Sequence, residues 1–230
     1  MELKININSE FKVCHSIFMQ NLFDNGGIPT ISKIHQGLNR KQDSSHSCFG
    51  CSLADTVLLI SNYLHKYSTF VDIKEDLSSY ILLQNLLVDR LDTILDIVEM
   101  PIEIRIKEFD IFKKINAWAY FLKQRPVFIS KYPTLYVLEN NMVSLDFKSY
   151  SLIVNDDFVD KFYKMRLSRG NFLTEFAKMG YKLESLSDKP ILLIVPNIAD
   201  ITNQLCCAVN SFTAILLSEK KYFDLYFKNL

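Results

Sequence analysis

The sequence predicts an α+β protein that is predominantly helical. We expect an N-terminal helical bundle with a long antiparallel helical hairpin, followed by a small β-sheet flanked by helices. Apolar residues recur every three or four positions through the middle of the chain, which is typical of amphipathic helices. After Pro126, short runs of β-branched and aromatic residues begin, as in strands. The mainly helical part is assigned to residues 1–130 and the smaller α+β part to 131–230, with one continuous domain as the alternative.

Composition supports a packed core. Hydrophobic residues make up 49% of the 230 residues, and only six Gly and six Pro are present, which excludes collagen-like and disordered classes. The 26 basic and 26 acidic side chains cancel, so no overall charge attracts nucleic acid or membrane. No apolar run approaches the roughly 20 residues of a membrane span. The five cysteines are an odd number without framework spacing. We therefore expect a soluble, cytoplasmic protein.

The first elements are a short strand, two helices and a polar loop. Leu3, Ile5 and Ile7 alternate with polar residues and predict a strand, which a helix over 11–23 follows. Residues 39–52 form the most polar stretch and are interpreted as a loop. Ser52 then serves as the N-cap of a helix over 53–67.

A long amphipathic helix is predicted over Leu77–Glu99. Its apolar stripe consists of Tyr80, Leu83, Leu87, Leu91, Ile94 and Val98. Another face carries polar and acidic residues: Asn85, Asp89, Asp92, Asp96 and Glu99. Pro101 is expected to end this helix, because the residue before a proline avoids α geometry.

A second amphipathic helix is predicted over about Glu103–Gln124. Its apolar face consists of Ile104, Ile111, Ile115, Trp118 and Leu122. Residues 72–99 contain seven acidic and two basic side chains, whereas residues 101–131 contain seven basic and three acidic ones. An acidic helix joined to a basic one by a short turn favours an antiparallel hairpin.

The C-terminal part is expected to combine strands with short helices. A β-hairpin is predicted from strands over 135–138 and 143–147, joined by Asn140-Asn141. The further elements are a strand over 150–154, helices capped by Asp156-Asp157 over 158–165 and by Asn171 over 172–179, a buried strand over 191–195 and one or two helices over 200–227. Gly180 closes the second of these helices, and the Cys206-Cys207 pair is assigned to the core.

One candidate metal site lies in the predicted loop. Cys48 and Cys51 form a Cys-x-x-Cys pair, which supplies half of a tetrahedral zinc site. The candidates for the remaining ligands are His46, His35, His65, Cys14 and His15. A redox-active pair is a further alternative. The simplest interpretation is a pair of free thiols in a loop that leads into a helix.

A second candidate uses Arg40 and His46, which are separated by five residues. This spacing resembles the Arg-x(4–6)-His pattern of HEPN-type ribonucleases, small helical proteins common in toxin–antitoxin and phage-defence systems. The resemblance implies that both residues lie in a dimer cleft and promote attack by the RNA 2′-hydroxyl without a metal. It covers seven residues, and Lys41 stands where the family typically has a polar residue.

Two charged faces complete the candidates. The acidic residues Asp89, Asp92, Asp96 and Glu99 lie at helical spacing and have the oxygen ligands of a divalent-cation site, although a solvated or hairpin-pairing face is the expected interpretation. The basic segment over 113–131 interleaves aromatic residues and is a candidate interaction surface, with nucleic acid as one partner class. Its basic residues are Lys113, Lys114, Lys123 and Arg125. Trp118 lies on the apolar stripe, which favours core packing.

The functional expectation is an interaction or accessory protein, a subunit or regulator of a larger assembly, with a protein partner and no cofactor. The sequence lacks the dinucleotide-binding, P-loop, zinc-protease and hydrolase motifs. The first alternative is a metal-independent ribonuclease using Arg40 and His46. The second is a zinc-stabilised protein with Cys48 and Cys51 as ligands.

Overall fold

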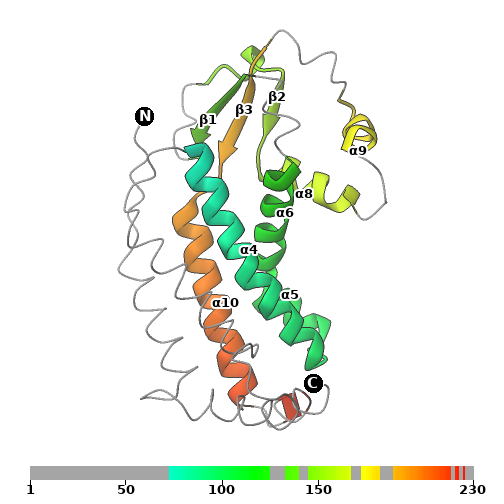
Figure 1. Cartoon of the computed structure of the whole chain (residues 1–230), viewed down its shortest axis with the longest axis vertical. Helices are drawn as coiled ribbons and strands as arrows, with labels where there is room; N and C mark the ends of the chain where they lie inside the picture. The colour runs from blue at the N-terminus through cyan, green and yellow to red at the C-terminus, as the bar shows by residue number, and fades with distance from the viewer. Residues whose placement is uncertain are drawn as a thin grey trace, which may run out of the picture. The chain divides into compact units, whose positions relative to one another are not determined.

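The structure, a computed structural model, describes residues 73–124, 133–139, 145–166, 172–181, 189–218, 221–222 and 225. The predicted N-terminal strand, the helices before residue 68 and the rest of the N-terminal bundle lie outside these residues. The described chain forms two compact units, residues 73–112 with 202–225 and residues 113–201. Each unit is described separately. The described part is mostly helical with one small sheet (Figure 1).

Helix α4 spans Ile73–Ile97 in the first unit. The predicted apolar stripe is confirmed, because Tyr80, Leu87, Leu91, Ile94 and Val98 are buried and Leu83 is half-buried. The helix ends in a Schellman motif: the Met100 amide donates to the Leu95 carbonyl at 2.9 Å, and the Glu99 amide donates to the Asp96 carbonyl at 3.0 Å. Glu99 adopts a φ of 52°, a left-handed conformation that glycine usually occupies.

The segment predicted as one helix over Glu103–Gln124 is two helices, α5 over Ile102–Glu108 and α6 over Asp110–Gln124. Phe109 breaks the segment with φ −126° and ψ 22°. Its ring is buried and packs on Phe112 at 5.4 Å and on Phe212 at 6.4 Å between centroids. We attribute the break to the burial of this ring. The prediction of one continuous helix considered helical spacing alone and did not include this contact.

The predicted antiparallel pairing of the two charged segments is not confirmed. Helix α4 belongs to the first unit, whereas α6 from Lys113 on belongs to the second. Leu87 and Trp118, central residues of the two stripes, are both buried. The amphipathic faces are thus real, and their pairing in a hairpin stays a prediction.

Helix α10 spans Ile198–Ser218 and lies beside α4 in the first unit from Thr202 on (Figure 1). Tyr80 and Gln84 of α4 both form hydrogen bonds with Thr202 of α10. The helical pattern predicts five inward-facing residues on α10, of which four are buried, Ile201, Leu205, Ala208 and Phe212, whereas the fifth, Ile215, is half-buried. None of the described helices is long and apolar enough to span a membrane.

The second unit contains a three-stranded parallel sheet. Its strands are β1 over Thr134–Leu138, β2 over Leu152–Val154 and β3 over Ile191–Val195, in the order β1-β3-β2 (Figure 1). Ile191 is opposite Thr134 on one side and Leu152 on the other. All five residues of β3 are buried, as the prediction of a wholly apolar strand required. A central parallel strand covered on both faces needs such a run.

The predicted β-hairpin is wrong for its described residues. Strand β1 pairs with β3 in parallel, and residues 147–149 form a short 3-10 helix, η2, and not a strand. The side chain of Asp146 caps this turn, since its Oδ1 accepts a hydrogen bond from the Lys148 amide at 3.1 Å and its Oδ2 accepts one from the Ser149 hydroxyl at 2.9 Å. A local side-chain cap of this kind competes with strand pairing. Residues 140–144, including the predicted turn, lie outside the described part.

Helix α8 spans Asp156–Arg166 and α9 spans Phe172–Lys178. Asn155 caps α8 through a 3.0 Å bond from the Phe158 amide to its Oδ1, so Asp156 and Asp157 are the first helical residues and not the cap. Gly180 follows α9 with φ 85°, and the bond from the Gly180 amide to the Ala177 carbonyl at 2.9 Å confirms its predicted role. Phe121 of α6 packs against Phe158 and Phe162 of α8, which forms the aromatic core of this unit.

Candidate functional site

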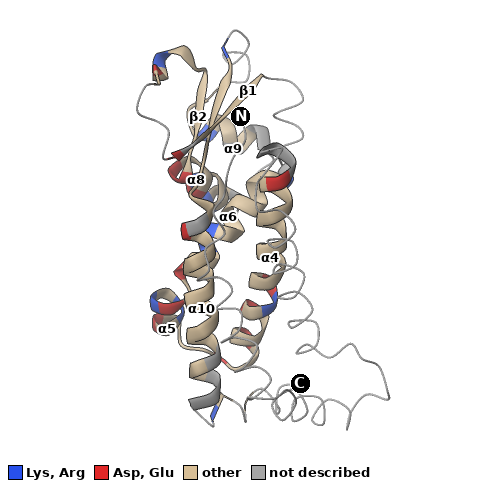
Figure 2. Ribbon diagram, turned by 90° about the vertical axis from the view of Figure 1, so that its left-hand side faces the viewer, with Lys and Arg blue, Asp and Glu red and all other residues tan. Residues whose placement is uncertain are grey.

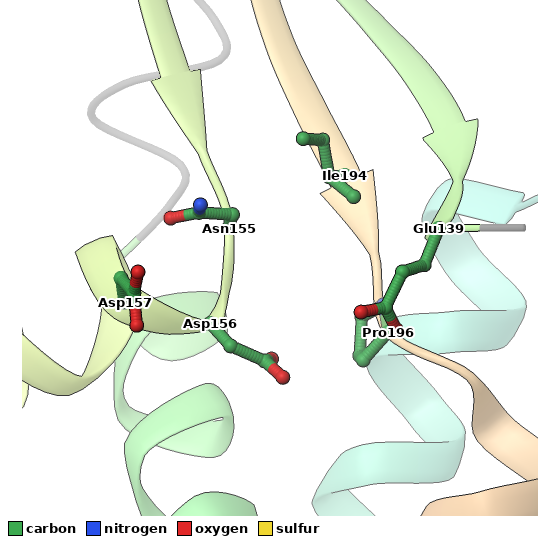
Figure 3. A pocket seen from close by; sticks show the side chains of 6 residues that line it. All are labelled: Glu139, Asn155, Asp156, Asp157, Ile194 and Pro196. Atoms are coloured by element: carbon green, nitrogen blue, oxygen red, sulfur yellow. The ribbon is translucent and has the colours of Figure 1, made fainter. Parts of the chain in front are cut away.

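A pocket of about 300 Å³ lies at the carboxyl edge of the parallel sheet (Figure 3). Because the three strands run in one direction, the residues that follow them meet at this edge. Ligands of open parallel sheets bind outside the carboxyl ends of the strands. Three of the six lining residues are acidic; the lining consists of Glu139, Asn155, Asp156, Asp157, Ile194 and Pro196.

Three of the lining residues lie directly after the ends of the three strands. Glu139 follows β1, Asn155 follows β2 and Pro196 follows β3. Figure 3 shows the side chains of Asp156 and Glu139 extending into the pocket from opposite sides. Asn155 is occupied by its capping bond, which fixes the start of α8 at the pocket wall. The site is thus built from backbone topology and one helix start.

Asp156 is held by two side chains of α6. Its Oδ1 accepts a hydrogen bond from Trp118 Nε1 at 2.7 Å, and its Oδ2 pairs with Lys114 Nζ at 2.5 Å. Lys114 and Trp118 are one helical turn apart, so both reach the same carboxylate. Trp118 is only 1% exposed, which makes its indole a rigid donor. Asp156 is therefore positioned and neutralised, and the free negative charge at the pocket belongs to the exposed Glu139 and Asp157.

The arrangement suits a ligand that donates hydrogen bonds and carries positive charge. Carboxylates accept several N–H bonds each and favour a cation nearby. Among the residues that the structure describes, no group of three His, Cys, Asp or Glu side chains could hold a metal ion. A primary amine or a guanidinium group fits this lining by charge and hydrogen-bonding chemistry.

The predicted site residues are distributed differently. Lys114 lies at the pocket as the partner of Asp156, whereas Lys113 and Lys123 are exposed. Arg125 lies outside the described residues. The candidates for ribonuclease chemistry and zinc binding also lie outside them: Arg40, His46, His35, Cys48 and Cys51. The burial of Trp118 confirms its predicted core packing and removes it as a platform for stacking bases.

The acidic face of α4 is exposed at three of its four acidic residues, and Asp92 is half-buried. Asp89, Asp96 and Glu99 are exposed, and Asp96 pairs with Arg105. Asn85, which the sequence placed on this face, is buried. Its Nδ2 donates to Asp89 Oδ1 at 3.2 Å.

The Cys206-Cys207 pair is divided between core and surface. Cys206 is buried as predicted, but Cys207 is exposed. The assignment of both thiols to the core is therefore wrong. The side chains of two successive residues in an α-helix differ by about 100° in direction around the axis. On a partly exposed helix, one of the pair can therefore point inward and the other outward.

Sequence reasoning missed the pocket acids Glu139, Asp156 and Asp157. The available signal was Asn155-Asp156-Asp157 directly after an apolar strand. These residues form a site with Glu139 only if the strands are parallel, because parallel strands bring Glu139 and Asn155 to the same carboxyl edge of the sheet. The antiparallel hairpin prediction put Glu139 at a turn instead.

A second candidate site is an apolar surface on α5 that consists of Ile102 and Ile106. We call these two residues the α5 surface. These residues are 61% and 53% exposed, one helical turn apart, on a helix with no buried residue. Polar contacts hold the helix in place. Arg105 Nη1 pairs with Asp96 Oδ1 at 2.6 Å, and Arg105 Nε donates to the Met100 carbonyl at 3.1 Å.

The end of α5 is joined to α10. The Ser211 hydroxyl donates to Glu108 Oε2 at 2.9 Å. This hydrogen bond, with the nearby Lys107, lowers the pKa of Glu108 below its ordinary value of 4.5. Figure 2 shows basic and acidic residues together on α5.

Comparison with protein-family models, with curated proteins and with solved structures finds no match for this chain.

Proposed function

We propose that this chain is an interaction protein, an accessory subunit or regulator, that inserts the α5 surface into an apolar groove of a partner protein. The observation that carries the proposal is the exposure of Ile102 and Ile106 on a helix that buries nothing. Covering such a side chain contributes about 1.5–3 kcal/mol. Two apolar anchors at i and i+4 match the recognition of a helix by a groove.

The polar contacts of α5 support this role. Arg105 and Glu108 hold the helix from the side and the end, so the two isoleucines are presented in one arrangement. A helix ordered before binding loses less conformational entropy on association. A docking element of this kind needs no core contacts of its own.

The rim chemistry of the partner follows from the neighbours of the α5 surface. Glu103 and Lys107 are exposed beside the isoleucines and have opposite charges. We expect the partner groove to be apolar at its centre and to carry both signs of charge at its edge. Such rim charges select orientation more than they add affinity.

The test compares Ile102→Asp/Ile106→Asp with Leu86→Asp, a control that changes an apolar side chain of 39% exposure on α4. One partner is first identified by crosslinking from position 102 or 106 of the otherwise wild-type chain. The wild type and both variants are then compared as bait for that partner. The double variant is expected to lose at least about tenfold in affinity for that partner, and the control to retain it. Equal affinity of all three proteins, or a wild type that crosslinks to no partner, contradicts the proposal.

A second candidate is the binding of a small organic cation in the carboxyl-edge pocket, which the pocket's position and acidic lining support. Trp118, the single tryptophan, donates to Asp156 and is a built-in fluorescence reporter. Titration with 1,4-diaminobutane or with arginine is expected to shift its emission saturably. Glu139→Gln should weaken the effect and Glu103→Gln should not. An emission spectrum that stays constant up to millimolar ligand refutes this candidate.

The ribonuclease and zinc alternatives stay predictions, because their residues lie outside the described part of the chain. Loss of RNA cleavage in His46→Ala would support the ribonuclease and would contradict a purely binding role. Stoichiometric zinc that is lost in Cys48→Ser would support the zinc-stabilised protein. Purified protein free of zinc would eliminate that alternative.

A further inference from the structure

A polar cluster lies inside the contact between α4 and α10. Tyr80, Gln84 and Thr202 are 0%, 0% and 6% exposed. The hydroxyls of Tyr80 and Thr202 share a hydrogen bond, and Gln84 Nε2 donates to Thr202 Oγ1 at 3.3 Å. Tyr80 and Gln84 are one turn apart on α4, so two side chains of one helix converge on a single hydroxyl of the other.

Buried apolar side chains alone do not define a position of one helix along the axis of the other. Buried apolar residues in this part of α4 and α10 include Leu77, Ile81, Val88, Leu205, Ala208 and Val209. Such side chains recur every turn, about 5.4 Å along the axis. A slide of one helix by one turn places apolar ridges opposite apolar grooves again.

The polar cluster distinguishes these positions. A one-turn slide of α10 separates the Thr202 hydroxyl from both Tyr80 and Gln84, so two hydrogen bonds between buried side chains are lost, which is unfavourable. We propose that Tyr80, Gln84 and Thr202 act as a conformational device that selects one axial register of α4 against α10.

The device has a cost in stability. Gln84 Oε1 is buried and accepts no hydrogen bond among the described residues. A cluster chosen only for stability would be apolar, because fully packed hydrophobic replacements of buried polar sets are often neutral or stabilising. A buried polar group that sets the register between helices is a known use of such residues.

The register of α10 also determines how α5 is held. Nine residues after Thr202, Ser211 contacts Glu108, and the next residue, Phe212, packs on Phe109. A one-turn slide separates both contacts. The cluster therefore fixes the presentation of Ile102 and Ile106, a consequence that rests on the proposed function.

The experiment uses the full chain with ¹³C-labelled isoleucine methyl groups and no partner. Wild type is expected to give one resonance each for Ile102 and Ile106. The triple variant Tyr80→Phe/Gln84→Leu/Thr202→Val is expected to keep or raise the urea midpoint but to give two or more resonances for each. Thr202→Val alone should lower the folding equilibrium constant by at least about tenfold, because Tyr80 and Gln84 then lose a shared buried partner.

Thr93→Val is the matched control, since Thr93 is exposed and its hydroxyl bonds only within α4, to the Asp89 carbonyl at 2.7 Å. It should leave both readouts unchanged. The proposal is overturned by a triple variant that retains single wild-type resonances or has a lower midpoint than wild type. Because no partner is present, this failure is distinct from a failure of the docking proposal.

Discussion

Replacement of Asp156 by alanine tests the arrangement at the carboxyl edge of the sheet. The change removes the acceptor of Trp118 Nε1 and leaves a donor on a residue of 1% exposure. A buried donor without a partner costs about 1–3 kcal/mol. The lost pair with Lys114 adds at most about 1 kcal/mol, because the two side chains are 34% and 41% exposed. Loss of an acidic residue in the first turn of α8 adds about 0.3–1 kcal/mol.

The expected total for Asp156→Ala is a loss of about 1–5 kcal/mol in the free energy of unfolding. Asp156→Asn retains an oxygen acceptor for the indole and should lose only about 1 kcal/mol. Urea denaturation followed by the fluorescence of Trp118 measures both values. Asp157→Ala is the control, because Asp157 is exposed at the next position of α8. If Asp156→Ala and Asp157→Ala differ by less than about 0.5 kcal/mol, the hydrogen bond to Trp118 contributes no net stability and the reasoning is refuted.

Three further changes test local features of the first unit. Glu99→Gly should raise the free energy of unfolding by about 0.5–1 kcal/mol in urea denaturation, because glycine adopts the φ of 52° without strain. Ser211→Ala should raise the Glu108 pKa toward 4.5 in an NMR titration. The wild-type Glu108 contribution to stability is present above pH 4.5 and is lost as the pH falls through the lowered pKa. Arg105→Ala should accelerate amide hydrogen exchange in α5 and leave α4 protected; unchanged exchange in α5 would contradict the anchoring role of Arg105.

Helical spacing predicted the described helices well because it reports burial directly. Tyr80, Leu87 and Trp118 were placed on buried faces from spacing alone, and all three are buried. The same reasoning missed the break at Phe109, since this residue is apolar and fits a continuous helix. Its non-helical φ and ψ depend on contacts with rings from distant sequence, such as Phe212.

Strand partners were harder to predict than strands. The apolar run of β3 specified a buried strand, but the sequence near β1 contains an Asn-Asn pair that favours a hairpin turn. The observed pairing of β1 with β3 joins residues more than 50 positions apart, which no local pattern reports. The candidate pocket depends on that pairing, so its acidic lining was visible in the sequence only as separate residues.

The break at Phe109 links the two candidate sites. Its buried ring follows the seven-residue helix α5, on which Ile102 and Ile106 are exposed. The same break restarts the chain as α6 at Asp110, and the spacing within α6 puts Lys114 and Trp118 on the face that holds Asp156. In an unbroken helix Ile102 and Ile106, 16 and 12 residues before Trp118, would lie about 160° and about 120° around the axis from it, because successive residues turn by about 100°. The two isoleucines therefore lie off the buried stripe of Trp118 even without the break, and one amphipathic segment supplies both a buried anchor and an exposed surface.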